Sequence, residues 1–156
     1  MVCVKRNGRK DVNWLVGYNI GVPAVMSNET TTTGTILIVD DDEGVTQTFA
    51  RMLRLEGYNV HTAVSAETGL REAERNRPDA IILDLRMPLM DGLVFLRHLR
   101  SNDDQRSTPV AIVTGDYFLD DAVSTELQQL GAELRFKPLW LEDLVGLARN
   151  LLKVTH

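Results

Sequence analysis

The chain has almost no cysteine and no long apolar run. Cys3 is its single cysteine, so an internal disulfide is impossible and a reducing compartment is expected. No apolar stretch approaches the roughly 20 residues that a membrane-spanning helix requires, so we expect a cytoplasmic protein without a membrane partner. Positive charge is not in excess either, because 17 Lys and Arg stand against 22 Asp and Glu, a net charge of −5. Since phosphate backbones demand clustered Lys and Arg, we expect no direct binding of nucleic acid.

The charge is unevenly spread and divides the chain in two. Residues 1–34 carry four basic and two acidic side chains, a net of +2, which leaves −7 for residues 35–156. We expect residues 1–34 to be a flexible or loosely docked extension, because they end in a tract of threonines at 30–33. Two alternatives stay open. Residues 14–22 superficially resemble a signal peptide, although Asn19 and two glycines interrupt them, and Met26 could be the true start, which would make the preceding residues an artefact.

Apolar runs that end at a polar side chain are the most informative pattern in residues 35–156. The runs are residues 36–39, 80–83, 110–113 and the shorter 134–136, and the residues that follow them are Asp40, Asp84, Thr114 and Lys137. Runs rich in Ile and Val are typical of parallel strands that are buried on both faces. In an open parallel sheet, the ligand site lies beyond the carboxyl ends of the strands. The sequence therefore predicts that these polar side chains meet in one crevice.

Amphipathic stretches between the runs predict helices. We expect them at residues 43–55, from an N-cap at Ser65, after the Asp91–Gly92 turn, at residues 119–130 and from residue 141 onward. Residues 58–63 alternate between apolar and polar and predict a strand near an edge. Strand followed by helix, five times over, predicts a flavodoxin-like, doubly wound α/β fold, with five helices on the two faces of a five-stranded parallel sheet. The strand order 2-1-3-4-5 would bring the two acid-bearing strands together.

Three aspartates at these strand ends form a candidate metal site. Asp40, Asp41 and Asp84 are hard oxygen ligands, and their mutual repulsion would raise their pKa values unless a cation relieved it. Mg²⁺ is the natural occupant, because it accepts one or two carboxylates together with a phosphoryl oxygen. Asp84 can then act as a nucleophile toward phosphorus. Thr114 offers a hydroxyl and Lys137 a mobile positive charge to the phosphoryl oxygens.

Each of these residues also has a purely structural explanation. An aspartate after a strand is commonly a turn former or a helix cap, and we interpret Asp42 as a cap and not as a ligand. Thr114 and Gly115 by themselves would form a turn, and Lys137 alone would be a surface charge. The joint occurrence of these residues in order, each at a strand end, favours the site.

Four sequence blocks resemble the signature of response-regulator receiver domains from two-component signalling. The blocks are residues 36–42, 83–92, 113–115 and 136–138, and the resemblance covers about residues 35–155. It implies a single-domain response regulator that is no turnover enzyme beyond its own phosphorylation and dephosphorylation. A sensor histidine kinase or a phosphotransfer protein would donate the phosphoryl group, and an unidentified downstream protein would receive the signal.

The resemblance also implies a role for each site residue. Asp84 would be the phosphoacceptor, and Mg²⁺ would be held by Asp40, Asp41, Asp84 and the backbone carbonyl of Arg86. Thr114 and Lys137 would contact the phosphoryl group. The peptide bond between Lys137 and Pro138 would be cis.

One departure from the family pattern concerns position 134, where family members usually carry an aromatic switch residue. Leu134 stands there, and the segment before Lys137 looks one residue shorter than usual. Phe136, Tyr117 or Trp140 could substitute, but packing or contact with a partner is an equally good explanation for each. A binding module that has lost its phosphorylation chemistry therefore stays open as an alternative function.

Arg86 bears on two further expectations. A magnesium-dependent phosphatase with an aspartyl intermediate would want an acid two residues beyond the nucleophile, where Arg86 stands, so we do not favour that enzyme. Arg86 and Asp116 lie two positions past Asp84 and Thr114, respectively, and we expect them to border the mouth of the pocket. An ion pair between them could hinder the water that hydrolyses the acyl phosphate.

Overall fold

The computed structural model describes residues 3–6, 9–12 and 34–154, which fall into two compact units, Met1–Thr32 and Thr33–His156. In the first unit, β1 (Cys3–Arg6) pairs antiparallel with β2 (Arg9–Val12), which the sequence pattern did not predict. Residues 1–2, 7–8 and 13–33, which include the resemblance to a signal peptide at 14–22 and the alternative start at Met26, lie outside the described residues. Its proposed flexibility stays a prediction.

The second unit alternates strands and helices. Its strands are β3 (Thr35–Val39), β4 (Asn59–Ala63), β5 (Ala80–Leu83), β6 (Val110–Thr114) and β7 (Ala132–Phe136). Its helices are α1 (Glu43–Leu55), α2 (Ala66–Asn76), α3 (Gly92–Ser101), α4 (Asp121–Gln129) and α5 (Leu141–Val154). Some predicted bounds were wrong: α4 begins at Asp121 and not at residue 119, β7 at Ala132 and not at residue 134, and β4 at Asn59 and not at residue 58.

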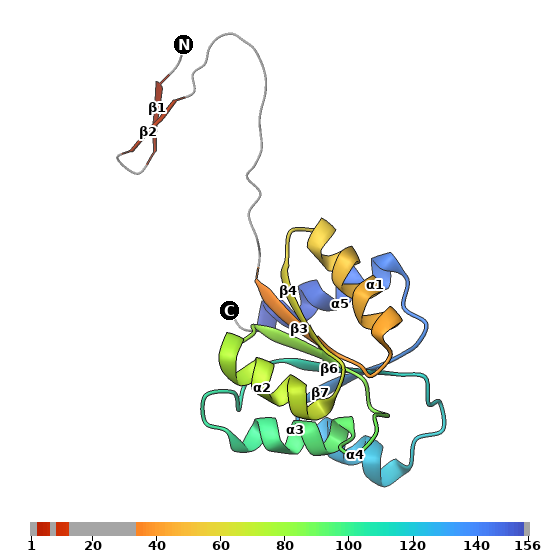
Figure 1. Ribbon diagram of the computed structural model, residues 1–156. Coiled ribbons are helices and arrows are strands. Elements are labelled where there is room, and N and C mark those ends of the chain that lie inside the picture. The colour runs from red at the N-terminus through yellow and green to blue at the C-terminus, as the bar shows by residue number, and fades with distance from the viewer. Residues whose placement is uncertain (1–2, 7–8, 13–33, 155–156) are drawn as a thin grey trace. The chain divides into compact units, whose positions relative to one another are not determined.

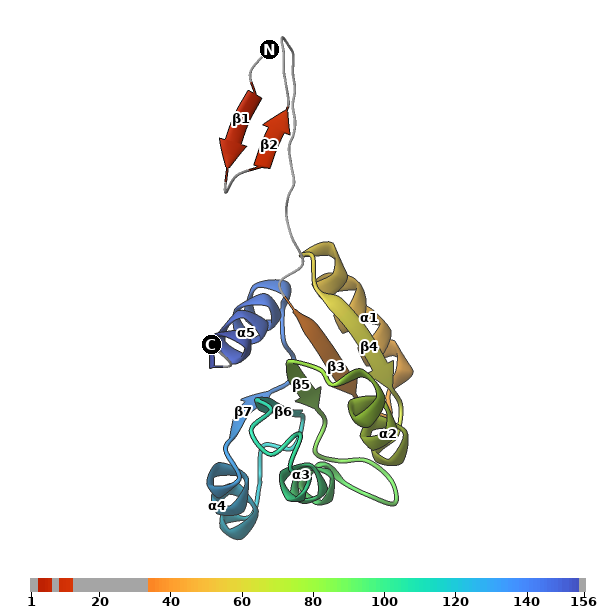
Figure 2. The ribbon, with the colours of Figure 1, turned by 90° about the vertical axis from the view of Figure 1, so that its left-hand side faces the viewer.

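The strands form one parallel sheet in the order β4-β3-β5-β6-β7. Counted along this unit the order is 2-1-3-4-5, so the predicted doubly wound fold is confirmed. Figures 1 and 2 show the helices divided between the two faces, with α1 and α5 on one side and α2, α3 and α4 on the other. The central strands β3, β5 and β6 are buried along their length, which explains why they read as continuous apolar runs.

Each face of the sheet has its own core. Under α2, α3 and α4 the side chains include Leu37, Leu83, Phe95, Leu96 and Leu127, and under α1 and α5 they include Ile36, Ile82, Phe49, Leu53 and Leu147. Consecutive strand residues alternate between these two cores, because side chains of a strand point to opposite faces. The cores hold the sheet rigid beneath the loops that follow its carboxyl edge.

Side-chain caps fix where three of the helices begin. Asp42, Ser65 and Asp91 each accept a hydrogen bond from the backbone N–H three residues later, so the interpretation of Asp42 as a cap is confirmed. Asp120, before α4, makes no such side-chain bond. Across the described segments, no helix combines the length and the apolar character needed to cross a membrane.

Candidate functional site

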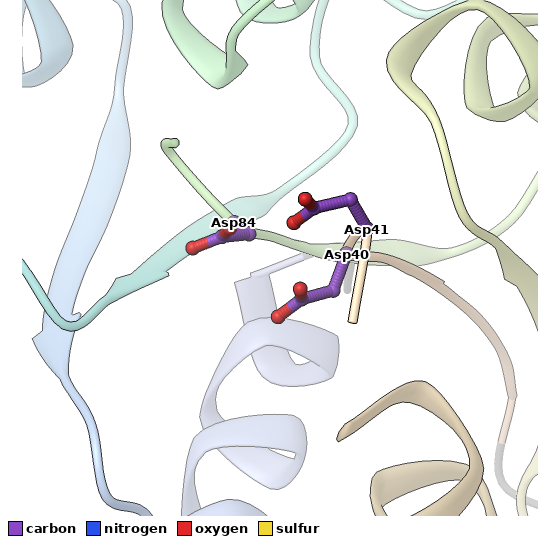
Figure 3. A group of neighbouring side chains, drawn as sticks. All are labelled: Asp40, Asp41 and Asp84. Atoms are coloured by element: carbon purple, nitrogen blue, oxygen red, sulfur yellow. The ribbon is translucent and has the colours of Figure 1, made fainter. Parts of the chain in front are cut away.

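Four of the five strands deliver the predicted polar side chains to one edge of the sheet. Asp40 and Asp41 follow β3, Asp84 follows β5, Thr114 ends β6 and Lys137 follows β7. The pairing of β3 with β5 sets Val39 opposite Leu83, and the N–H of Asp84 donates to the carbonyl of Val39 at 2.8 Å. The two acid-bearing strands are thus neighbours, and Figure 3 shows the three carboxyl groups lying side by side.

The acidic cluster combines proximity with burial. Asp40, Asp41 and Asp84 each present a carboxylate oxygen, and these oxygens lie within 4.8 Å of one another. Asp40 and Asp84 are buried, whereas Asp41 is exposed. Burial, reinforced by the negative charge of Asp40, raises the pKa of Asp84 from 3.8 to about 6, although the nearby Lys137 acts in the opposite direction. The environment of the cluster therefore disfavours the ionised form of Asp84.

Lys137 places the balancing positive charge. Its Nζ lies 2.7 Å from Oδ2 of Asp40 and 3.5 Å from Oδ1 of Asp84. Burial disfavours the charged ammonium, but the hydrogen bonds and charges of the two aspartates outweigh burial and raise the pKa of Lys137. The peptide bond between Lys137 and Pro138 is cis, as the resemblance implied.

The loop after β6 ties Thr114 to the rest of the site. Thr114 is fully buried, and its hydroxyl oxygen accepts a hydrogen bond from the N–H of Asp116 at 3.1 Å. Its backbone carbonyl accepts from the N–H of Lys137 at 2.8 Å. The predicted contact of Thr114 with a phosphoryl group stays a prediction, but the residue lies on the strand between those of Asp84 and Lys137.

The ion pair expected between Arg86 and Asp116 is present. Nε and Nη2 of Arg86 donate to Oδ2 of Asp116 at 2.9 and 2.6 Å. The guanidinium, and after it the N–H of Phe118, holds the pKa of Asp116 below its usual range. The side chain of Arg86 is about half exposed, so solvent screens the pair and it adds little to stability. It joins the loop after β5 to the loop after β6.

Three contacts at the site were not anticipated from the sequence. The Tyr117 hydroxyl donates to the backbone carbonyl of Lys137, and the Tyr117 ring stacks on Phe136. A Cβ added at Gly92 would lie 2.6 Å from the backbone oxygen of Asp84, so only glycine fits there without a shift. The Asp-Gly pair had indicated a turn, but no local pattern reveals which backbone approaches it.

Leu134 stands where family members usually carry an aromatic residue. It is half-buried and packs against the core under α2, α3 and α4. Of the three possible substitutes, Tyr117 and Phe136 stack on each other, and Trp140 is 67% exposed.

The residues of the cluster fit a divalent cation. Three ionised carboxylates, two of them buried, and one ammonium group leave a net charge of −2, and all the candidate ligands are hard oxygens. Burial, and after it the negative charge of Asp40, raises the pKa of Asp84, and a bound cation would oppose both by favouring the ionised carboxylate. Asp40, Asp41 and Asp84 are therefore the side chains that would hold Mg²⁺.

Comparison with known proteins identifies the family to which the chain is similar. A family model described as the response regulator receiver domain matches residues 36–148. The chain is 39% identical over 118 residues to the transcriptional regulatory protein PrrA of Mycobacterium tuberculosis (strain ATCC 25618 / H37Rv), covering 76% of this chain and 49% of PrrA. It is 38% identical over 123 residues to the response regulator MprA of Mycobacterium sp. (strain KMS), covering 77% of this chain and 51% of MprA.

The fold agrees with a solved structure as well. The chemotaxis response regulator CheY4 of Vibrio cholerae matches with a TM-score of 0.70 at 29% identity, covering 79% of this chain and 100% of CheY4. The chain spans about half the length of the curated relatives it matches. Because the family model covers most of the chain and each of the four sequence blocks falls at a strand end of the expected sheet, the chain belongs to the response regulator receiver domain family.

Proposed function

We propose that this receiver domain is a phosphorylation-dependent switch and that Asp84 is its phosphoacceptor. The observation that carries the proposal is the position of the Asp84 carboxyl group, inside an acidic cluster and 3.5 Å from the ammonium of Lys137. The carboxylate therefore lies among groups that would hold a cation and near a positive charge suited to a phosphoryl oxygen.

The donor that we propose is the phosphohistidine of a sensor histidine kinase or of a phosphotransfer protein. A carboxylate oxygen of Asp84 attacks phosphorus, a P–O bond forms, and the P–N bond to the imidazole breaks. The imidazole leaves with the electron pair of that bond and takes up a proton. When bound, Mg²⁺ would neutralise charge on the phosphoryl oxygens, and Asp40, Asp41, Asp84 and the carbonyl of Arg86 would hold it.

Two further residues of this chain would position the phosphoryl group and neutralise its charge. Lys137 would move its ammonium from Asp40 toward the phosphoryl group, because the acyl phosphate carries more negative charge than the carboxylate. The Thr114 hydroxyl would donate a hydrogen bond to the phosphoryl group. Its oxygen accepts a bond from the Asp116 N–H, which leaves its hydrogen for this purpose. The resulting shift would change the surface between residues 119 and 152, where we propose that a downstream protein binds.

We propose a phosphoacceptor and not a turnover enzyme. A phosphatase with an aspartyl intermediate needs a general acid near the nucleophile, and the side chain two residues beyond Asp84 is Arg86, which is paired with Asp116. The expected cytoplasmic location and the absence of direct nucleic-acid binding stay predictions. PrrA, which is about twice as long as the matched segment, is named as a transcriptional regulatory protein.

The test is phosphorylation by acetyl phosphate in magnesium chloride, followed by intact mass. Wild type should gain the mass of one phosphoryl group, and Asp84→Asn should gain none. Asp79→Asn is a matched control, because Asp79 is an exposed acid before the opposite end of the same strand, and this variant should react like wild type. A folded wild-type protein that binds Mg²⁺ and takes up no phosphoryl group would instead be the binding module with lapsed chemistry.

A further inference from the structure

We propose that Tyr117 is a positioning residue for Lys137 and that it couples the loop after Thr114 to the ammonium group. This inference rests on the proposed phosphorylation of Asp84. The Tyr117 hydroxyl donates to the backbone carbonyl of Lys137, and the Tyr117 ring stacks on Phe136, with centroids 5.3 Å apart and planes at 22°. A single side chain thus contacts two consecutive residues at the end of β7.

Lys137 needs such support because the sheet ends just before it. The last pair in the register of β6 and β7 is Thr114 with Phe136, and the N–H of Lys137 donates to the carbonyl of Thr114 at 2.8 Å. Beyond this bond the chain leaves the ladder. The hydroxyl of Tyr117 holds the next backbone group, the carbonyl of Lys137, so the backbone from which the ammonium extends is bound on both sides of its Cα.

The loop that carries Tyr117 also carries Asp116, which is hydrogen-bonded to both Thr114 and Arg86. The N–H of Asp116 donates to the hydroxyl oxygen of Thr114, and the carboxylate of Asp116 accepts from both Arg86 and the N–H of Phe118. Apart from the bond to Arg86, these hydrogen bonds lie within five residues, 114–118. A displacement of Thr114 toward a phosphoryl group would therefore move the loop, and Tyr117 would transmit that movement to Lys137.

Core packing does not explain the aromatic pair. Tyr117 is 58% exposed and Phe136 is 39% exposed, so their contact buries little apolar surface and contributes little to folding. The hydroxyl contact, by contrast, ends on the residue whose Nζ lies between Asp40 and Asp84. Loss of this contact should affect the reaction of Asp84 more than the stability of the domain.

The decisive variant is Tyr117→Phe, which keeps the ring and removes the hydroxyl. With acetyl phosphate and magnesium chloride, we expect its maximal rate of Asp84 phosphorylation to fall about two- to tenfold, the factor that one neutral hydrogen bond represents. The donor concentration at half-maximal rate should stay unchanged, because Lys137 acts on the reacting phosphoryl group. Tyr58→Phe is the matched control, since Tyr58 precedes β4 and packs against the core under α1, and it should react like wild type.

A double-mutant cycle separates positioning from a general effect on structure. Lys137→Ala should itself slow phosphorylation, and Tyr117→Phe should cause no further loss in that background, because its effect passes through Lys137. The urea midpoint of Tyr117→Phe should match that of wild type. An unchanged rate for Tyr117→Phe, or an equal loss with and without Lys137, would overturn the inference.

The same experiment distinguishes two kinds of failure. A wild-type protein that gains no phosphoryl group contradicts the proposed function, and with it this inference. If wild type reacts at Asp84 and Tyr117→Phe reacts equally fast, the proposed function stands and only the role of Tyr117 is wrong.

Discussion

Replacing Asp84 by asparagine should stabilise the metal-free protein at neutral pH. The wild-type carboxyl must ionise in a site where burial and the charge of Asp40 raise its pKa from 3.8 to about 6. The folded protein therefore binds this proton more tightly than the unfolded chain does. The stability that follows is fully present below pH 3.8 and is lost as the pH rises through about 6. An asparagine of the same size has no charge to bury.

The size of this effect follows from the shift. Each pKa unit represents about 1.36 kcal/mol, and a shift of about two units makes the ionised Asp84 cost about 3 kcal/mol near pH 7.5. For a domain of this length, about 3 kcal/mol corresponds to a rise of roughly 10 °C in Tm. At pH 5 the folded wild-type carboxyl is mostly protonated, and the advantage of the variant should fall to about half.

The assay is urea unfolding of wild type and Asp84→Asn in EDTA at pH 7.5 and pH 5. Asp79→Asn, the exposed acid before the other end of β5, serves as the control and should show no comparable gain. Added magnesium chloride should raise the stability of wild type and narrow the gap, because the cation relieves the repulsion among the carboxylates. A gap that is absent at pH 7.5, or that does not shrink at pH 5, would refute the argument.

Two further variants test the ion pair between Arg86 and Asp116 and the close approach of Gly92 to the backbone of Asp84. Arg86→Ala should shorten the lifetime of the phosphoryl group severalfold, measured as loss of mass after the donor is removed, whereas Arg97→Ala, which breaks an exposed bidentate pair elsewhere, should leave it unchanged. An unaltered lifetime in Arg86→Ala would end the idea that this pair hinders water. Gly92→Ala should lower both stability and the phosphorylation rate, because its Cβ would press on the backbone oxygen of Asp84. Gly146→Ala, in open space on α5, should instead stabilise by up to ~1 kcal/mol in thermal unfolding, and equal behaviour of the two glycine variants would contradict this account.

Local pattern was sufficient to predict most of the fold. The Ile- and Val-rich runs predicted the three central strands, because a parallel strand with helices on both faces must be apolar on both faces. The caps at Asp42 and Ser65 were also visible, because a capping side chain acts within three residues of its own position. The bounds of α4 and β7 were less predictable. Leu119 and Ala132 both pack against the core, but Leu119 lies before α4 and Ala132 lies within β7. Periodicity does not distinguish a buried residue inside an element from one just outside it.

The strand order depended on chemistry and not on periodicity. The pattern of apolar residues is the same whichever strands are neighbours, and only the need to gather Asp40 and Asp84 favoured the order that the sheet has. The pairing of Arg86 with Asp116 was predicted in the same way, from positions counted relative to two strand ends.

The amino-acid sequence by itself determined the α/β class, the caps, and which charged and hydroxyl groups end the strands, because these depend on neighbours along the chain. Only the tertiary structure decided that the Tyr117 hydroxyl reaches the Lys137 carbonyl, that Gly92 lies against the backbone of Asp84, and that burial raises the pKa of that aspartate. Such contacts join residues on separate loops. Their distances depend on how the whole sheet and its helices pack, which no short stretch of sequence specifies.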